Sequence, residues 1–281
     1  MKKIINHPIS RIILGVIISL GIPMLINKPI LKNLFKLIGL NDTINGLIRV
    51  SFASVILMPV LYIWFYKKVE KRRITEWSFD KFFKESMLGL ILSVASISFL
   101  VFLCSIFVDI DINFSGITGQ LIPGVLLIFG LVLIEEIAFR GILYRILEEK
   151  LGMNWALLIS GVLFGLAHIT NDNITFQSLL GVISGGLLMG ALFSYRRRMW
   201  LPIFAHYGWN LAQVLFGINL SGTDKFSDIA IFKTTLNGPV AITGGEFGIE
   251  NSIFAIIFVT IVFVVFYRLT KRELPTEAND T

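Results

Sequence analysis

Cysteine, histidine and charge are scarce in this sequence of 281 residues. A single cysteine, Cys104, excludes an intramolecular disulfide framework, and it excludes a cysteine-based zinc finger, which needs at least two thiolates. Charged residues make up 16% of the chain, whereas soluble domains average about 25%. With 55% hydrophobic residues and a mean hydropathy of +0.78, the chain is too apolar for a soluble domain. We therefore expect a polytopic membrane protein.

Apolar runs of about 17 to 25 residues, the length that crosses a bilayer as a helix, recur along the sequence. We expect eight of them, in the ranges 9–26, 47–66, 86–108, 121–143, 154–170, 176–195, 200–218 and 252–269. The predicted fold class is an all-α transmembrane helical bundle, a single membrane domain of residues 1–281 with a disordered tail at 272–281. The longest stretch without a predicted helix is 219–251, which is rich in Gly, Thr and Asn.

The net charge of +6 comes from short basic clusters between the apolar runs. With the N-terminus inside, the inner segments carry 19 lysines and arginines and the outer segments carry 6. This bias is typical of a membrane topology signal and predicts that both termini are cytoplasmic. No nucleic-acid partner is expected. The first run has a basic start, like a signal peptide, but we expect it to be an uncleaved span.

Few ionisable residues interrupt the apolar runs. They are Glu135, Glu136 and Arg140 in the fourth run, His168 in the fifth and His206 in the seventh. An intramembrane charge costs about 2.5–3.5 kcal/mol on insertion scales, so such groups usually mark a functional site or a water-filled cavity. Glu136 and Arg140 are four residues apart and share a helix face, which predicts a buried ion pair.

Glu135 has no cation three or four residues away on its own helix, so its partner must lie on another helix. Glu135 lies 15 residues before Lys150, and His168 lies 15 residues after Met153. At about 1.5 Å per residue, both are about 22 Å from the same turn. An antiparallel helical hairpin therefore places Glu135 and His168 at the same depth.

The seventh run supplies the remaining polar groups. His206 and Asn210 are four residues apart and point from one helix face. His206 also follows the basic cluster Arg196–Arg198 by two to three turns. We therefore expect one region, entered from the cytoplasmic side, that gathers a carboxylate, two imidazoles and an amide.

Three motifs carry a family resemblance. They are Glu135-Glu136-Ile-Ala-Phe-Arg140-Gly141, Phe164-Gly-Leu-Ala-His168 and His206-Tyr-Gly-Trp-Asn210, the last preceded by Trp200 and Pro202. Their order and spacing resemble the CPBP family of intramembrane proteases, which includes CAAX prenyl protease 2 and the Abi-type and bacteriocin-processing enzymes. The resemblance covers about residues 120–210 and defines a catalytic core at 120–211. The segment 243–250 is similar to a Gly-rich stretch of some members, and is otherwise a surface loop. Arg196–Arg198 departs from the small polar turn that members often have.

The chemistry of the residues and the resemblance imply the same division of roles. The protein would be an intramembrane endopeptidase that hydrolyses a peptide bond of a membrane-associated or lipidated peptide or protein. Glu135 would act as general base on a water that His168 orients. His206 and Asn210 would donate hydrogen bonds to the developing oxyanion. Arg140 would hold Glu136.

Two alternatives stay open. Glu135, His168 and His206 could instead bind Zn²⁺ with water as fourth ligand, so either no cofactor is required or zinc is. The chain could also be a non-catalytic bacteriocin immunity or scaffold protein, or a proton-coupled transporter, although the matched broken spans of a transporter are not seen. The expected location is a bacterial cell membrane, with lipid and a peptide or lipidated protein as partners.

Overall fold

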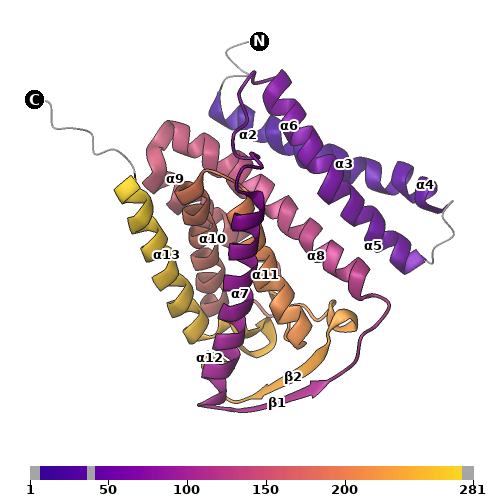
Figure 1. Cartoon of the computed structure of the whole chain (residues 1–281), viewed down its shortest axis with the longest axis vertical. Helices are drawn as coiled ribbons and strands as arrows, with labels where there is room; N and C mark the ends of the chain where they lie inside the picture. Colours follow the sequence, from indigo (N-terminus) through magenta and orange to yellow (C-terminus); the bar gives the residue numbers. More distant parts are fainter. Residues whose placement is uncertain (1–6, 37–41, 274–281) are drawn as a thin grey trace, which may run out of the picture.

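A computed structural model describes residues 7–36 and 42–273, and most of these are helical (Figure 1). The N-terminal helices are α2 (Pro8–Val16), α3 (Ile22–Ile26), α4 (Lys32–Lys36), α5 (Asp42–Phe52) and α6 (Met58–Lys68), joined by the π-helical turns η1 (Ile17–Gly21), η2 (Asn27–Leu31) and η3 (Ala53–Leu57). The central helices are α7 (Phe82–Ser105), α8 (Leu121–Glu136), the π-helix η4 (Ile137–Tyr144), α9 (Arg145–Ala167), α10 (Phe176–Arg196) and α11 (Trp200–Phe216). The remaining elements are β1 (Asp109–Phe114), η5 (Ser227–Ile229), β2 (Phe232–Asn237), α12 (Val240–Thr243), η6 (Gly245–Phe247), η7 (Ile249–Asn251) and α13 (Ile253–Glu273).

By length and apolar composition, the described residues contain six helical stretches that could cross a membrane, where the sequence analysis expects eight apolar runs. They are Pro8–Ile26, Ile48–Lys68, Phe82–Ser105, Leu121–Ala167, Phe176–Arg196 and Ile253–Arg272. The predicted fourth and fifth runs form one stretch, Leu121–Ala167, which breaks at Gly152. The predicted seventh run is the 17-residue helix α11, which ends at Gly217. The orientation of the termini stays a prediction, and most of the predicted tail 272–281 lies outside the described residues.

The break at Gly152 makes the helical hairpin that the sequence analysis expects. Its φ of 77° and ψ of 170° lie in a region that glycine adopts without steric cost. The first arm runs from α8 through η4 and the start of α9, and the second arm returns over 153–167. This reversal places the ends of the two arms side by side, which is the arrangement that the site requires.

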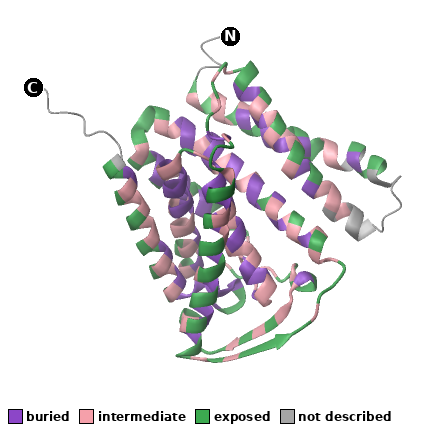
Figure 2. Cartoon of the chain, viewed as in Figure 1, coloured by how far each residue is buried: buried purple, intermediate pink, exposed green. Residues whose placement is uncertain are grey.

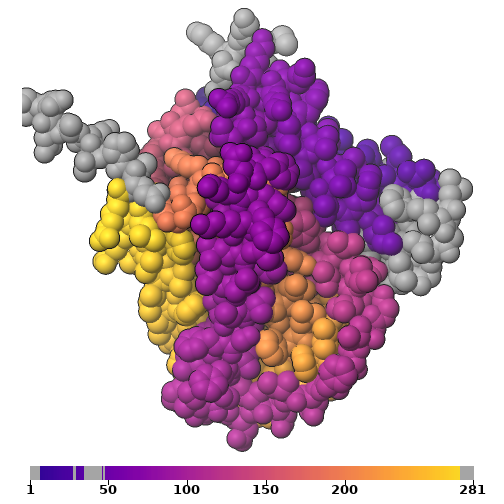
Figure 3. Space-filling model, viewed as in Figure 1, coloured from indigo at the N-terminus to yellow at the C-terminus, as the bar shows by residue number. Residues whose placement is uncertain are grey.

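Close helix packing holds the bundle together. Helix α7 lies along α11, and α10 lies between α9 and α13. Gly89 of α7 and Gly208 of α11 have no room for a side chain, because an added Cβ would lie 2.7 Å from Ala205 N and 2.9 Å from Leu90 O, respectively. Figure 3 shows α7 across one face of the bundle with α11 visible beside it. Outward apolar side chains are exposed on α7 and α13 (Figure 2), as for helices that face lipid.

The two ends of the bundle differ. One end, here named the basic end, carries the start of α2, the segment 69–81, the turn at 145–153, the turn at 196–199 and the end of α13 (Figure 1). The other, here named the sheet end, carries the β1–β2 sheet and the segments 169–175 and 217–252. The two strands are antiparallel, with Asp109 opposite Asn237 and Phe114 opposite Phe232. This sheet corrects the all-α prediction. Pairing between strands so far apart in the sequence leaves no local periodic signal.

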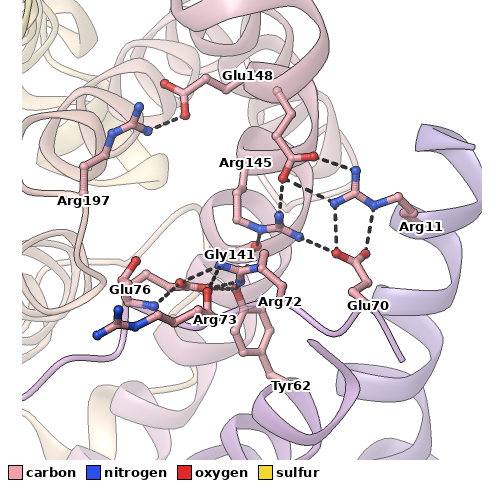
Figure 4. Close-up of polar contacts among 12 residues, drawn as sticks. Arg11, Tyr62, Glu70, Arg72, Arg73, Glu76, Gly141, Arg145, Glu148 and Arg197 are labelled. Carbon is pink, nitrogen blue, oxygen red and sulfur yellow. Dashed lines mark hydrogen bonds and ion pairs between the residues drawn. The ribbon is translucent and has the colours of Figure 1, made fainter. Parts of the chain in front are cut away.

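Ion pairs link the helices at the basic end (Figure 4). Arg11 Nε lies 2.9 Å from Glu70 Oε1, and Arg11 Nη1 lies 2.6 Å from Glu149 Oε2. Arg145 Nη1 lies 2.6 Å from Glu149 Oε1, so this carboxylate joins α2 to α9. Glu148 accepts from Arg197 and so joins α9 to the α10–α11 turn.

Glu76 is the centre of a second group at the basic end. It accepts hydrogen bonds from Arg72, and its Oε1 lies 2.6 Å from Tyr62 Oη, which lies 3.0 Å from Gly141 O (Figure 4). Burial disfavours the ionised carboxyl, but the hydrogen bonds and charge of Arg72 outweigh it and hold the pKa of Glu76 below its usual value. The backbone of Glu76 also accepts from Met199 N at 2.9 Å, just before α11 begins.

Candidate active site

Glu135 and Glu136 end α8, and the π-helix η4 follows them directly. π-Helical turns inside α-helices are rare and are frequent at functional sites. Glu136 is 0% exposed and Arg140 is 1% exposed, and Arg140 Nη1 lies 2.8 Å from Glu136 Oε1. Arg140 Nη2 donates to Gly186 O at 3.0 Å, and its guanidinium carbon lies 4.7 Å from the centre of the Phe164 ring. The structure thus contains the ion pair that the four-residue spacing predicts.

The same carboxylate also binds His206. Glu136 Oε1 lies 2.8 Å from His206 Nδ1. Because a carboxylate only accepts, the proton of this bond is on Nδ1. The other ring nitrogen, Nε2, points to Glu135 and lies 3.8 Å from its Oε2. Glu136 therefore keeps a proton on Nδ1 and sets the direction of the His206 ring.

His168 is fixed in a parallel way. Its Nδ1 lies 2.8 Å from the carbonyl oxygen of Phe164, one turn earlier in α9. This acceptor again places the proton on Nδ1 and leaves the lone pair on Nε2. His168 Nε2 lies 3.9 Å from Glu135 Oε2. The antiparallel arms bring Glu135 and His168 to one depth.

Glu135 Oε2 thus faces two imidazole nitrogens from two other helices. The atom is buried and has no hydrogen-bond partner among the described residues. Separations of 3.8 and 3.9 Å are too long for hydrogen bonds, but they suit a water that bridges the three groups. The arrangement can hold a water between a proton acceptor and two orienting rings.

Glu135, His168 and His206 are also the donors of the zinc alternative. The acceptors on both Nδ1 atoms are of the kind that metal-bound histidines have. Within residues 7–36 and 42–273, however, no group of three or more His, Cys, Asp and Glu side chains is placed to hold a metal ion. Zinc therefore stays a prediction from the sequence.

Two cavities meet at these residues. The first, here named the polar cleft, is a cavity of about 470 Å³ lined by Glu135, His168, His206 and Asn210 and by residues of the segments 169–175 and 217–231. The second, here named the apolar cavity, is a cavity of about 80 Å³ between α9, α10, α11 and α13. His168, His206 and Asn210 line both cavities. A chain in the polar cleft can therefore extend a side chain into the apolar cavity.

Glu250 is a site residue that the sequence analysis did not select. It lines the apolar cavity, and its Oε1 accepts from the backbone N–H and the hydroxyl of Ser221 at 2.8 and 2.7 Å. Its Oε2 accepts from Trp209 and Gln213, both at 3.3 Å. The segment around it is not a surface loop, because Phe247 and its neighbours are buried. The Gly-rich stretch 243–250 was the signal for this residue.

Other residues of the motifs lie away from the reactive centre. Trp200 Nε1 donates to Ser78 O at 2.7 Å, and its ring lies 5.2 Å from that of Trp77, so it anchors the start of α11 at the basic end. Pro202 is buried in the first turn of α11. Arg198 of the basic cluster pairs with Glu85 of α7.

Residues 117–212 match the family model described as "Type II CAAX prenyl endopeptidase Rce1-like". A curated relative is the protein named "Putative membrane peptidase YdiL" of Bacillus subtilis (strain 168). It is 34% identical over 98 residues, which cover 34% of this chain and 38% of that protein. The chain thus matches a little over a third of this relative's length. No solved structure matches the chain. The matches say nothing of a metal or of bacteriocin immunity.

Proposed function

Residues 117–212 belong to the Rce1-like type II CAAX prenyl endopeptidase family, and on that premise we propose that this chain is a membrane-embedded endopeptidase. Its substrate is a peptide or protein segment at the membrane, whose scissile bond enters the polar cleft. Six apolar helical stretches long enough to cross a bilayer support the membrane location.

The observation that carries the proposal is the position of Glu135 Oε2, 3.9 Å from His168 Nε2 and 3.8 Å from His206 Nε2. A water between these groups donates one hydrogen to His168 Nε2, whose lone pair is free. It donates the other hydrogen to Glu135. The oxygen of this water is then directed at the carbonyl carbon of a peptide bond in the polar cleft.

The proton transfers balance through Glu135. The carboxylate takes a proton as the water oxygen bonds to the carbonyl carbon, and it returns that proton to the amide nitrogen as the C–N bond breaks. His206 lies between two carboxylates and acts as an imidazolium. It gives Nδ1–H to Glu136 and directs Nε2–H to the oxyanion. Asn210 is the second donor to that oxyanion.

Arg140 and Glu136 act on His206 rather than on the substrate. Arg140 compensates the buried charge of Glu136, and Glu136 holds the ring of His206 at 2.8 Å. The apolar cavity takes an apolar side chain of the substrate next to the scissile bond. Glu250 forms part of its wall and fixes the segment around Ser221.

The test is cleavage of lipidated and unlipidated peptides by the purified full-length chain in lipid nanodiscs. We expect Glu135→Gln to lower kcat at least 100-fold and to fold like the wild type. Glu246→Gln is the matched control, because it makes the same change at an exposed carboxylate of the sheet end. Cleavage that survives a chelator but not Glu135→Gln supports the metal-free mechanism. Equal activity of Glu135→Gln and wild type contradicts the proposal.

A further inference from the structure

The lining of the polar cleft reaches the sheet end of the bundle. Its mouth is lined by Asn171 and Asp172 after α9 and by Thr223, Lys225 and Phe226 after α11. Helix α8 begins at this end and contributes Ile128, Leu131 and Glu135 to the lining, and Phe139 of η4 follows them in the chain. The loop residues at 171–172 and 223–226 belong to the sheet end, as defined above.

The opposite path, from the basic end to Glu135, is filled. Ile137, Ile142 and Tyr144 of η4 are 0% exposed, and so are Met199 and Ile203 at the start of α11. Glu136 and Arg140 are buried between these side chains and the reactive centre. A peptide therefore cannot reach Glu135 from the basic end without unpacking the core.

The two ends carry opposite charge. The sheet end has seven acidic residues and two lysines, which are Asp109, Asp111, Asp172, Asp224, Asp228, Glu246, Glu250, Lys225 and Lys233. The basic end and the helix ends that join it have 16 lysines and arginines and seven acidic residues. The basic residues are Arg11, Lys67, Lys68, Lys71, Arg72, Arg73, Lys81, Lys84, Arg145, Lys150, Arg196, Arg197, Arg198, Arg268, Lys271 and Arg272, and the acidic residues are Glu70, Glu76, Asp80, Glu85, Glu148, Glu149 and Glu273. Because lysine and arginine are enriched in cytoplasmic loops, the basic end is the cytoplasmic one.

From this charge asymmetry and the position of the mouth, we infer that the active site opens on the extracytoplasmic side of the membrane. The inference rests on the proposed function. It assigns the substrate class as a peptide segment on the outer face of the membrane, either an exported peptide or an outer juxtamembrane segment of a membrane protein. This is opposite to the side that the sequence analysis predicts.

The nearness of His206 to Arg196–Arg198 in the sequence favours a cytoplasmic opening, but this nearness does not set the side. His206 lies at the level of the buried core, so its distance along α11 is compatible with an opening at either end. The side of the opening depends on which loops leave space next to Glu135. These are the loops of the sheet end.

Cysteine labelling tests the inference without any need for catalysis. Cys104 is buried and is the one cysteine of the chain, so Cys104→Ala gives a background for single cysteines. Thr223→Cys and Asp172→Cys lie at the mouth, and Lys150→Cys lies in the exposed turn of the basic end. Spheroplasts of a bacterial host that express each full-length variant are treated with a membrane-impermeant sulfonated maleimide, before and after permeabilisation.

We expect Thr223→Cys and Asp172→Cys to react in intact spheroplasts and Lys150→Cys to react only after permeabilisation. The reverse pattern would overturn the inference. Two mouth positions are used so that poor folding of one variant does not decide the result. If an inactive protein still gives the expected labelling pattern, the topology is correct and only the protease proposal fails.

A second measurement joins the two proposals. An impermeant hydrophilic peptide that the purified enzyme cleaves is added outside intact spheroplasts, with Glu135→Gln as the blank. Cleavage outside the cells supports the extracytoplasmic opening. Cleavage that begins only after permeabilisation contradicts it and leaves the endopeptidase proposal intact.

Discussion

His206 Nδ1 and Arg140 Nη1 both lie 2.8 Å from one oxygen atom, Glu136 Oε1. The carboxylate that balances a buried arginine is therefore the same group that orients an imidazole of the site. Oε2 of Glu135, the adjacent residue, has no hydrogen-bond partner in the described part of the chain, and Glu135 lines the polar cleft. The two neighbouring glutamates thus have separate tasks, one in positioning and one in chemistry.

Arg140→Met should destabilise the chain by about 3–5 kcal/mol, because it leaves the buried carboxylate of Glu136 without its main countercharge. Chemical unfolding in detergent micelles measures the change. Arg197→Met is the matched control, since its side chain is 53% exposed in the pair with Glu148, and such pairs contribute about 1 kcal/mol or less. Equal losses of unfolding free energy in the two variants would contradict the idea that burial makes the Arg140–Glu136 pair matter more than the exposed pair.

Glu136→Gln should lower kcat by about 10- to 100-fold and leave KM nearly unchanged. The amide keeps an acceptor near His206 Nδ1 but removes the charge that favours the imidazolium, which acts in the transition state. Steady-state cleavage of one peptide by Glu136→Gln and by Glu135→Gln gives the comparison. The positioning role is wrong if Glu136→Gln raises KM and keeps the wild-type kcat.

Glu76 should make the stability of the basic end fall in acid. The carboxyl has its ordinary pKa of 4.5 in the unfolded chain and a lower pKa in the folded chain. The stabilisation is therefore fully present above about pH 4.5 and is lost as the pH falls through the folded value. Thermal unfolding of wild type and Glu76→Gln at pH 7 and below pH 4 checks this. We expect a smaller acid-induced drop in Tm for Glu76→Gln, and equal drops would contradict the prediction.

Gly185→Leu should restrict the apolar cavity without unfolding the chain. An added Cβ at Gly185, which lines this cavity, meets no atom within 4 Å. We expect a rise in KM for peptides with a large apolar residue next to the scissile bond, and little change for peptides with alanine there. Gly186→Leu is the contrast, because its Cβ would lie 3.0 Å from Phe164 Cβ and 3.1 Å from Gly161 O, so it should lower Tm. Unchanged kinetics for Gly185→Leu would exclude the cavity from substrate binding.

The reactive centre was predictable where local geometry decides it. A separation of four residues on one helix was enough to pair Glu136 with Arg140. Glu135 and His168 lie the same number of residues from one turn, and this was enough to predict that an antiparallel hairpin brings them to one depth. Both depend only on helical rise and on a reversal, which Gly152 supplies. The roles of these residues in catalysis stay predictions.

The rest depends on contacts between distant segments. Glu250 reaches the apolar cavity because Ser221, Trp209 and Gln213 bind its carboxylate, and none of them is near it in the sequence. The β1–β2 sheet has the same origin. The π-helix η4 has no distinct residue pattern, because its side chains suit an α-helix equally well. Eight predicted runs correspond to six long apolar helical stretches, because the fourth and fifth runs are continuous across Gly152 and α11 has only 17 residues.

The pairing of Asp109 with Asn237 sets an order on the assembly of the protein. Strand β1 is synthesised before Glu135, His168 and His206, whereas its partner β2 is synthesised after them. The backbone of β1 therefore stays without its β2 partner until the three helices of the active site have been made and inserted. The β1–β2 sheet of the sheet end forms only after β2 has been synthesised. A nascent chain stopped before residue 232 would hold every reactive group proposed here and still lack the strand that pairs with β1.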